Sequence, residues 1–321
     1  NSERRIKVGD RVCRLLGHFH CCGRSTGTTR MNPWDKRRDQ SGWSGGYVEW
    51  IERGIAHLSV VFSWQLDRAY QSAIWHKTIG REVRAGGPAV DLQPDYLTDV
   101  ADCEGSTMAI RRHNPRACFT TRGCIRQCPF CAVPKIEGKF RELDDIQLRP
   151  IVCDNNFLAA SRRHFDFVVD GLKAFDRADF NQGLDARLLT KYHAERLAEL
   201  DFKWLRLAWD NVNTERQFMQ AWETLRDAGV PAGKIAVYVL IGFHDTPEDA
   251  LYRLDTVWNE LKSWPFPMRY QPLDAKRRNE YAGKHWTDRE LKRYVKYWSN
   301  LRHLSGIPFE EYDPWRRPKV E

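Results

Sequence analysis

The sequence lacks any long apolar segment, and this absence argues against a membrane-spanning or secreted protein. No apolar run approaches the roughly 20 residues that a membrane-spanning helix needs. The first ten residues, NSERRIKVGD, contain neither an initiator methionine nor the apolar core of a signal peptide, so the original N-terminus is expected to be missing or trimmed. We therefore expect a cytoplasmic protein with no membrane partner.

Internal repeats and low-complexity tracts are also absent, and the composition is not that of a disordered chain. Hydrophobic residues make up 42% and charged residues 29%, which is typical of globular proteins. The 321 residues exceed the size at which a single core stops growing. We predict an N-terminal α/β unit with its connector over residues 1–112 and a larger core with a C-terminal helical extension over residues 113–321.

The net charge of +8, from 51 Lys and Arg against 43 Asp and Glu, fits a polyanionic partner such as nucleic acid. It fits a solvated basic surface equally well. The basic, aromatic stretch 269–304 could track phosphates and stack on bases. The alternative is a closing helix whose Lys and Arg form an exposed stripe, because five apolar residues follow helical spacing: Leu291, Tyr294, Val295, Trp298 and Leu301.

The nine cysteines are an odd number in a chain without a secretion signal, which argues against a disulfide framework. Three of them form Cys124-x3-Cys128-x2-Cys131, within the segment TTRGCIRQCPFCAVPKIEGKFREL (120–143). Three thiolates so close in sequence can hold three irons of an iron–sulfur cube, which leaves the fourth iron open for chemistry. A zinc site completed by a distant Cys or His is the alternative.

Strands and helices alternate from Cys118 onward, which predicts an α/β fold with a parallel sheet, open or closed into a barrel. The expected strands are 118–122, 150–156, 179–186, 204–210, 234–242 and 268–273, and the expected helices are about 160–174, 190–200, 213–228, 246–262 and 287–303. Function is then expected at the C-terminal ends of the strands. Thr287 and Glu290 match a capping box for the last helix.

A smaller strand–helix–strand pattern precedes this alternation. We expect strands at 58–64 and 82–90 around a helix at 65–79, which ends at Gly80. Lys7–Leu16 is a further candidate strand, and residues 17–46 read as a long loop.

The cysteine motif resembles the signature of the radical S-adenosylmethionine (radical SAM) superfamily. In that family the three cysteines bind a 4Fe-4S cluster, SAM occupies the fourth iron, and one electron cleaves SAM to a 5′-deoxyadenosyl radical that abstracts hydrogen from the substrate. The resemblance implies a cluster on Cys124, Cys128 and Cys131, and Phe130 fills the family's aromatic position beside the cofactor. It also implies an electron donor such as flavodoxin or ferredoxin.

The wider segment, about residues 118–275, is most similar to methylthiotransferases and to radical SAM enzymes that carry a cobalamin-binding-like domain. This implies a partial (β/α)6 TIM-like barrel, preceded by a small, degenerate cobalamin-binding-like α/β unit. The sequence contains no Asp-x-His-x-x-Gly, the motif whose His ligates cobalt, so cobalamin is not expected as a cofactor.

Position by position, the resemblance places six polar residues and one glycine beside SAM at the strand ends: Asp154, Asn156, Gln182, Asp185, Arg187, Asp210 and Gly242. Carboxylates and amides there can accept from the ribose hydroxyls and the ammonium group, and Arg187 could clamp the SAM carboxylate. Helix capping or a solvated loop is the alternative for each polar side chain. In the turn after the fifth strand His244 and Asp245 replace the family's Pro-Gly, and Asp245 and Thr246 are expected to cap the next helix.

The remaining cysteines allow a second cluster on Cys13, Cys21 or Cys22, and Cys103, as in methylthiotransferases, but we favour buried or loop thiols. The expected function is reductive cleavage of SAM and radical modification of a nucleotide or nucleic-acid base. A small metabolite or a peptide is the alternative substrate. A non-enzymatic iron–sulfur or zinc protein that binds nucleic acid is the alternative class.

Overall fold

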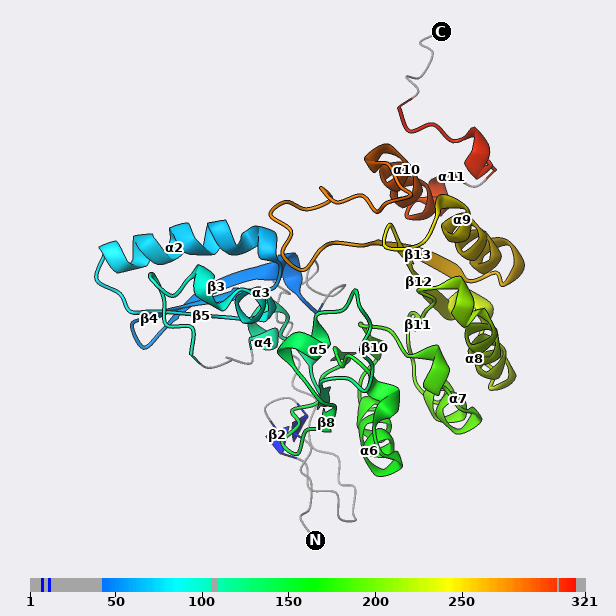
Figure 1. The fold of residues 1–321 in the computed structure, drawn as a ribbon. Helices are drawn as coiled ribbons and strands as arrows, with labels where there is room; N and C mark the ends of the chain where they lie inside the picture. Colours follow the sequence, from blue (N-terminus) through cyan, green and yellow to red (C-terminus); the bar gives the residue numbers. More distant parts are fainter. Residues whose placement is uncertain (1–6, 9–10, 13–41, 105–108, 305, 316–321) are drawn as a thin grey trace. The chain divides into compact units, whose positions relative to one another are not determined.

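The computed structural model describes residues 7–8, 11–12, 42–104, 109–304 and 306–315 (Figure 1). The chain packs into two compact units. Unit 1 comprises Asn1–Arg126 and Ala132–Gln182, and unit 2 comprises Gln127–Cys131 and Gly183–Glu321. The domain boundary after residue 112 stays a prediction. Within the described ranges, no helix is long and apolar enough to cross a bilayer.

The first sheet of unit 1 has the order β3-β4-β5. Its strands are β3 (Tyr47–Glu52), β4 (Ile55–Val60) and β5 (Val83–Gly86), with β3 antiparallel and β5 parallel to β4. Helix α2 (Leu66–Thr78) lies along this sheet and buries Leu66, Ala69 and Ala73 (Figure 1). The predicted strand–helix–strand pattern is therefore present. Strand β3 was not predicted, because among its side chains only Tyr47 is buried and the strand shows no apolar alternation.

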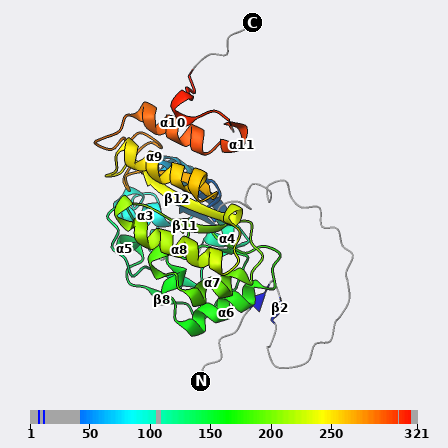
Figure 2. The ribbon, with the colours of Figure 1, turned by 90° about the vertical axis from the view of Figure 1, so that its right-hand side faces the viewer.

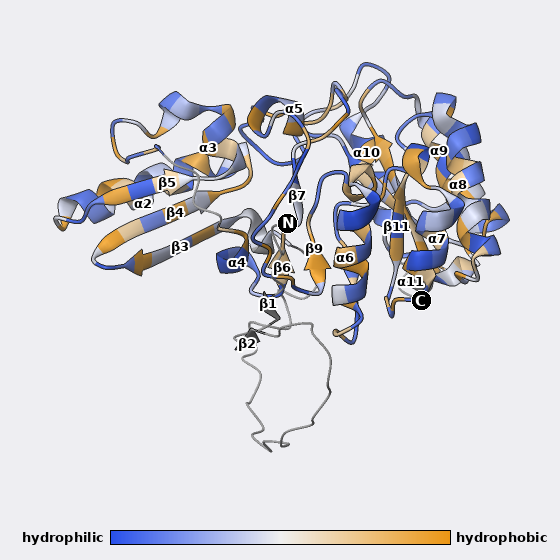
Figure 3. Cartoon of the chain, turned by 90° about the horizontal axis from the view of Figure 1, so that it is seen from below, coloured by the Kyte–Doolittle hydropathy of each residue, from blue (hydrophilic) through white to orange (hydrophobic). Residues whose placement is uncertain are grey.

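The second sheet of unit 1 is parallel and has the order β10-β9-β6. Its strands are short: β6 (Ala117–Cys118), β9 (Ile151–Val152) and β10 (Asp179–Phe180). The apolar side of α6 (Arg162–Leu172) is buried through Phe165, Val168 and Val169. Figure 3 shows the hydrophobic colour of β9 and the mixed surface of α6. The predicted strand 118–122 is divided, because β7 (Thr121–Arg122) pairs antiparallel with β8 (Arg141–Glu142) instead.

Unit 2 contains a parallel sheet with the order β11-β12-β13. Its strands are β11 (Leu205–Ala208), β12 (Ile235–Ile241) and β13 (Trp264–Arg269), and Leu184 adds a single parallel bridge to Leu207. Helices α7 (Lys191–Ala198), α8 (Glu215–Asp227) and α9 (Pro247–Asp255) lie side by side in Figure 2. A π-helical turn, Thr256–Glu260, continues α9.

The chain closes with α10 (Asp288–Trp298) and α11 (Leu301–Leu304). The capping box predicted for Thr287 is present, with Glu290 N donating to Thr287 Oγ1 at 3.2 Å and Thr287 N donating to Glu290 Oε2 at 2.8 Å. The predicted packing side is buried at Leu291, Tyr294 and Trp298. The remaining short elements are β1 (Lys7–Val8), β2 (Arg11–Val12), α3 (Pro88–Leu92), α4 (Ile110–His113) and α5 (Val133–Ile136).

These elements confirm an α/β fold built of small sheets, and no closed barrel is present among the described residues. The last strand, β13, begins earlier than the predicted strand 268–273. Its sequence WPFPMR contains two prolines, which argue against a strand in the interior of a sheet. In this structure β13 lies at the edge of its sheet and pairs only with β12, where prolines are tolerated.

Candidate metal and cofactor site

The cysteine loop, residues 123–131, begins in unit 1 at Gly123, directly after β7. Gly123 has φ +72°, and a Cβ atom there would lie 2.2 Å from the carbonyl oxygen of Lys139. Only glycine fits this position without moving backbone. Cys124 N donates to Gly138 O at 3.4 Å, so the backbone of the loop is held against residues 138–139.

Glu137 secures the same loop through its carboxylate. Its Oε2 accepts from Gly123 N at 2.8 Å and from Asn155 Nδ2 at 2.8 Å, and its Oε1 pairs with Arg122 Nη2 at 3.1 Å. Glu137 was not predicted from the sequence. Its only signal is that it lies within the conspicuous segment 120–143.

The Cys124 sulfur receives two hydrogen bonds within unit 1. Arg126 N donates to Sγ at 3.3 Å, and the Nδ2 of buried Asn156 donates at 3.5 Å. Donors directed at a sulfur stabilise its thiolate form, which is the form that binds metal. Asn156 therefore lies beside the cysteine loop, as predicted, and its contact is with Cys124.

Asp154 lies two residues after β9 and is buried. Its carboxylate accepts from Thr120 N at 2.6 Å and from Thr120 Oγ1. Burial raises the pKa of Asp154 to about 6, while the donors from Thr120 and Thr121 oppose this shift. The carboxyl fastens the end of β6 to the end of β9, so its observed contacts are structural.

Cys128 and Cys131 belong to unit 2, where Cys131 N donates to Cys128 O at 3.0 Å to form a turn. Phe130, between them, meets Phe243 edge-on with ring centroids 5.7 Å apart. Phe243 also contacts Tyr270 at 4.7 Å, just after β13. An aromatic cluster of Phe130, Phe243 and Tyr270 thus adjoins the second and third cysteines.

Arg187 and Asp185 follow the bridge formed by Leu184. Arg187 Nε donates to Asp185 Oδ1 at 2.6 Å and Nη2 donates to Oδ2 at 3.1 Å. The Asp185 carboxylate raises the pKa of Arg187, and a hydrogen bond to Cys128 contributes in the same direction. The Arg187 guanidinium, which was predicted to clamp a ligand carboxylate, therefore binds Asp185. It also forms a hydrogen bond with Cys128.

Asp210, after β11, is a carboxyl for which the described residues provide no hydrogen bond. Burial raises the pKa of Asp210 to about 6; the charges of Arg253 and Arg187 oppose the shift, and Asp185 adds to it. Asp185, Arg187 and Asp210 are therefore close enough to influence one another's ionisation. A polar ligand that donates to Asp210 would satisfy a carboxyl that is already partly desolvated.

Arg253, which was not predicted from the sequence, organises the turn after β12. Its side chain is fully buried; Nη2 pairs with Asp245 Oδ2 at 2.8 Å and Nη1 donates to Trp209 O at 2.9 Å. Asp245 Oδ1 in turn accepts from Gly242 N at 2.9 Å. One signal for its role was present in the sequence: Arg253 lies on the same face of α9 as the apolar residues Ala250 and Leu254.

Two further predictions concern this turn. Thr246 caps α9 and Asp249 completes a capping box, as predicted for Thr246. Asp245 does not cap the helix: it binds Arg253 and the amides of the turn, because a buried guanidinium needs a carboxylate partner. Gly242 has φ +81°, a left-handed conformation that favours glycine, and a Cβ atom there would lie 2.8 Å from the Leu291 side chain, which would have to shift.

Gln182 and Cys103, which were also predicted as candidate site residues, make none of the contacts described above. Gln182 is exposed in the turn after β10 and makes no hydrogen bond with a described residue. Cys103 is partly buried, 3.7 Å from Ala101 O, and burial raises the pKa of its thiol. Cys13, Cys21 and Cys22 lie outside the described residues, so the second cluster stays a prediction.

The thiols of the motif differ in environment from the buried cysteines. Cys124, Cys128 and Cys131 are partly exposed, and the first two accept hydrogen bonds from Asn156 and Arg187. Burial instead raises the pKa of Cys118 to about 12, which keeps that thiol protonated. The donor chemistry of the motif therefore fits iron–sulfur ligation.

Across the two units, the assignment of the three cysteines to one metal rests on their sequence spacing. Among the described residues, no three His, Cys, Asp or Glu side chains are grouped as a metal site. In comparisons with known proteins, no family model matches this chain and no curated protein matches it.

Proposed function

We propose that this protein is a radical SAM enzyme that binds a 4Fe-4S cluster on Cys124, Cys128 and Cys131. The spacing Cys-x3-Cys-x2-Cys carries the proposal. The hydrogen bonds from Asn156 to Cys124 and from Arg187 to Cys128 support it, because such donors stabilise ligating thiolates. A partial (β/α)6 barrel is proposed with it, and a degenerate cobalamin-binding-like unit before it.

When bound, the cluster would supply the electron that cleaves SAM reductively. The chain's own residues would hold and shield the reactants. Phe130, Phe243 and Tyr270 provide apolar surface that excludes water beside Cys128 and Cys131. Asp210 would accept from the ammonium or a ribose hydroxyl of SAM, since its carboxyl lacks a hydrogen bond to the described chain. We propose a nucleotide or nucleic-acid base as the substrate, a reduced flavodoxin or ferredoxin as the electron donor, and the cytoplasm as the location.

Anaerobic reconstitution followed by an assay for 5′-deoxyadenosine tests the proposal. We expect about four irons and four sulfides per chain, and 5′-deoxyadenosine on addition of SAM and dithionite. Cys124→Ser, Cys128→Ser and Cys131→Ser should each abolish the product, whereas Cys103→Ser should leave it unchanged. Zinc without iron, or a cluster that never yields 5′-deoxyadenosine, would reject the enzyme.

A further inference from the structure

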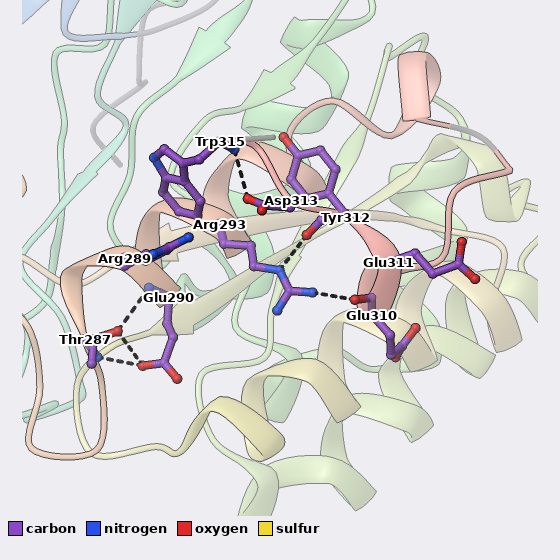
Figure 4. A pocket seen from close by; sticks show the side chains of 9 residues that line it. All are labelled: Thr287, Arg289, Glu290, Arg293, Glu310, Glu311, Tyr312, Asp313 and Trp315. Carbon is purple, nitrogen blue, oxygen red and sulfur yellow. Dashed lines mark hydrogen bonds between the residues drawn. The ribbon is translucent and has the colours of Figure 1, made fainter. Parts of the chain in front are cut away.

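Helix α10 presents an exposed basic face in unit 2. Arg289, Lys292 and Lys296 lie at positions i, i+3 and i+7, which share one side of a helix, and all three are exposed. Trp315 lies over this face: the Arg289 guanidinium is 4.7 Å and the Lys296 ammonium 5.5 Å from its ring centroid. Trp315 nevertheless remains 40% exposed, although an indole ring gains from burial. Figure 4 shows Trp315 beside Arg289 at one side of a pocket.

The segment that carries Trp315 is fixed to α10. Arg293 Nε donates to Tyr312 O at 2.8 Å and its Nη2 donates to Glu310 O at 3.1 Å (Figure 4). The same Nη2 also donates to Phe309 O at 2.5 Å. Trp315 N donates to Asp313 Oδ1 at 2.9 Å. The indole is therefore held as a preformed platform, which lowers the entropy cost of stacking a ligand ring on it.

The loop before α10 extends the basic surface. It contains four exposed cations, Lys276, Arg277, Arg278 and Lys284. Arg269 ties the loop to the start of α10, because it donates to Tyr281 O at 2.6 Å and pairs with Asp288 at 3.0 Å. In the part of the chain that the structure describes, none of these four cations, nor Arg289 or Lys296, pairs with a carboxylate.

Three of the carboxylates near this surface are engaged, and in the loop Asp274 and Glu280 are outnumbered by the four cations. Asp288 pairs with Arg269 and with Lys292, Asp313 accepts from Trp315 N, and Glu290 caps α10. Glu310 and Glu311 lie on the side of the pocket away from Arg289 in Figure 4. The face around Trp315 is therefore complementary to a polyanion.

The same loop leads to the aromatic cluster of the candidate site. Tyr281 meets Tyr270 edge-on at 5.3 Å, and Tyr270 contacts Phe243. A Cβ atom on Gly283 would lie 2.6 Å from Gly242 O, so the loop packs directly on the turn after β12. A ligand held on the basic loop would thus lie close to Phe243 and Phe130.

We propose that α10, the loop 274–285 and Trp315 form a binding surface for single-stranded nucleic acid. A base stacks on Trp315, and the cations contact the phosphates on either side. A duplex does not offer a free base face, so single strands are the favoured occupant. The inference deepens the proposed function, because the bound strand would present the base to be modified, but strand binding is measured without the reaction.

Fluorescence anisotropy with the reconstituted full chain and a 5′-labelled 12-nucleotide RNA tests the surface, with DNA of the same sequence and the RNA duplex as comparisons. We expect Trp315→Ala to weaken binding of the preferred strand about tenfold and Trp315→Phe to retain most of it. Arg289→Gln/Lys296→Gln should reduce the slope of log K against log salt by about 1 to 2. The matched control, Lys191→Gln/Lys234→Gln, removes two exposed charges elsewhere in unit 2 and should leave the slope unchanged.

Three outcomes would reject the proposed binding surface. These are no binding of RNA or DNA, equal binding of single strand and duplex, or a reduction of the salt slope in the control Lys191→Gln/Lys234→Gln as large as that in Arg289→Gln/Lys296→Gln. Stronger binding of RNA than of DNA, or the reverse, identifies the strand and supports the surface. Formation of 5′-deoxyadenosine by the wild type is measured separately. If the strand binds and no 5′-deoxyadenosine forms, the proposed function fails and the surface stands.

Discussion

Asp154 shows how burial sets the chemistry of a single side chain at the end of β9. Its pKa is raised from 3.8 to about 6, so the folded protein binds this proton more tightly than the unfolded chain does. The protonated Asp154 carboxyl stabilises the folded protein fully below the pKa that Asp154 has in the unfolded chain. This stabilisation is lost as the pH rises through the pKa of Asp154 in the folded protein. The wild type should therefore lose stability, relative to Asp154→Asn, as the pH rises from about 4 through 6.

We expect this loss to reach about 1 kcal/mol between about pH 5 and pH 8. Urea unfolding of the wild type and of Asp154→Asn across this range measures it. Asp95→Asn, an exposed aspartate in the same unit, is the control and should follow the wild type at every pH. Parallel curves for the wild type and Asp154→Asn would show that Asp154 is ionised throughout.

The buried ion pair of Arg253 and Asp245 is the second residue-scale feature. Arg253→Met should destabilise unit 2 by about 3 kcal/mol, because it leaves the Asp245 carboxylate without its partner. Adding Asp245→Asn should recover part of the loss, which gives a coupling of at least about 1 kcal/mol in a double-mutant cycle. Chemical denaturation followed by circular dichroism measures all four proteins.

The exposed pair Lys173 and Asp170, 3.0 Å apart, is the comparison for this cycle. Lys173→Met and Asp170→Asn should couple by less than about 0.5 kcal/mol, because solvent screens exposed charges. Equal coupling energies in the two cycles would contradict the structural role of Arg253.

At the scale of elements, the cysteine loop depends on its first glycine. Gly123 and Gly138 both have positive φ, but only Gly123 would bring a Cβ atom against backbone; at Gly138 the space is open. Gly138→Ala should cost about 1 kcal/mol for its left-handed backbone. Gly123→Ala should cost more, and it alone should lower the iron content after reconstitution. Thermal unfolding and iron analysis of both variants measure this, and equal effects would contradict the argument.

The helices were predicted from the sequence more completely than the strands. The helices from α6 to α10 follow from apolar residues at helical spacing, and their starts at Thr246 and Thr287 follow from capping residues. Strand β3 was not predicted, because it has no apolar alternation. The start of β13 was misplaced, because its two prolines argue against a strand unless the strand lies at the edge of a sheet. Residues such as Glu137 and Arg253 were missed because their partners are assembled by the fold.

At the scale of the whole molecule, the six described cysteines should divide by exposure. Brief alkylation of the metal-free protein should label Cys103, Cys124, Cys128 and Cys131 before the buried Cys118 and Cys153. After reconstitution, the three cysteines of the motif should become protected while Cys103 still reacts. Peptide mass spectrometry measures each site. Protection of Cys103 together with the motif would contradict the proposed assignment of ligands.

The sequence alone determined the alternation of strands and helices, the capped helix starts and the Cys-x3-Cys-x2-Cys spacing, because these depend on residues a few positions apart. Only the tertiary structure decided which polar side chains serve the loop: Asn156 and Glu137 hold the region of Cys124, and Arg187 engages both Asp185 and Cys128. The reason is physical: a hydrogen bond or a buried charge depends on neighbours brought together by folding, and their separation along the chain leaves no periodic trace.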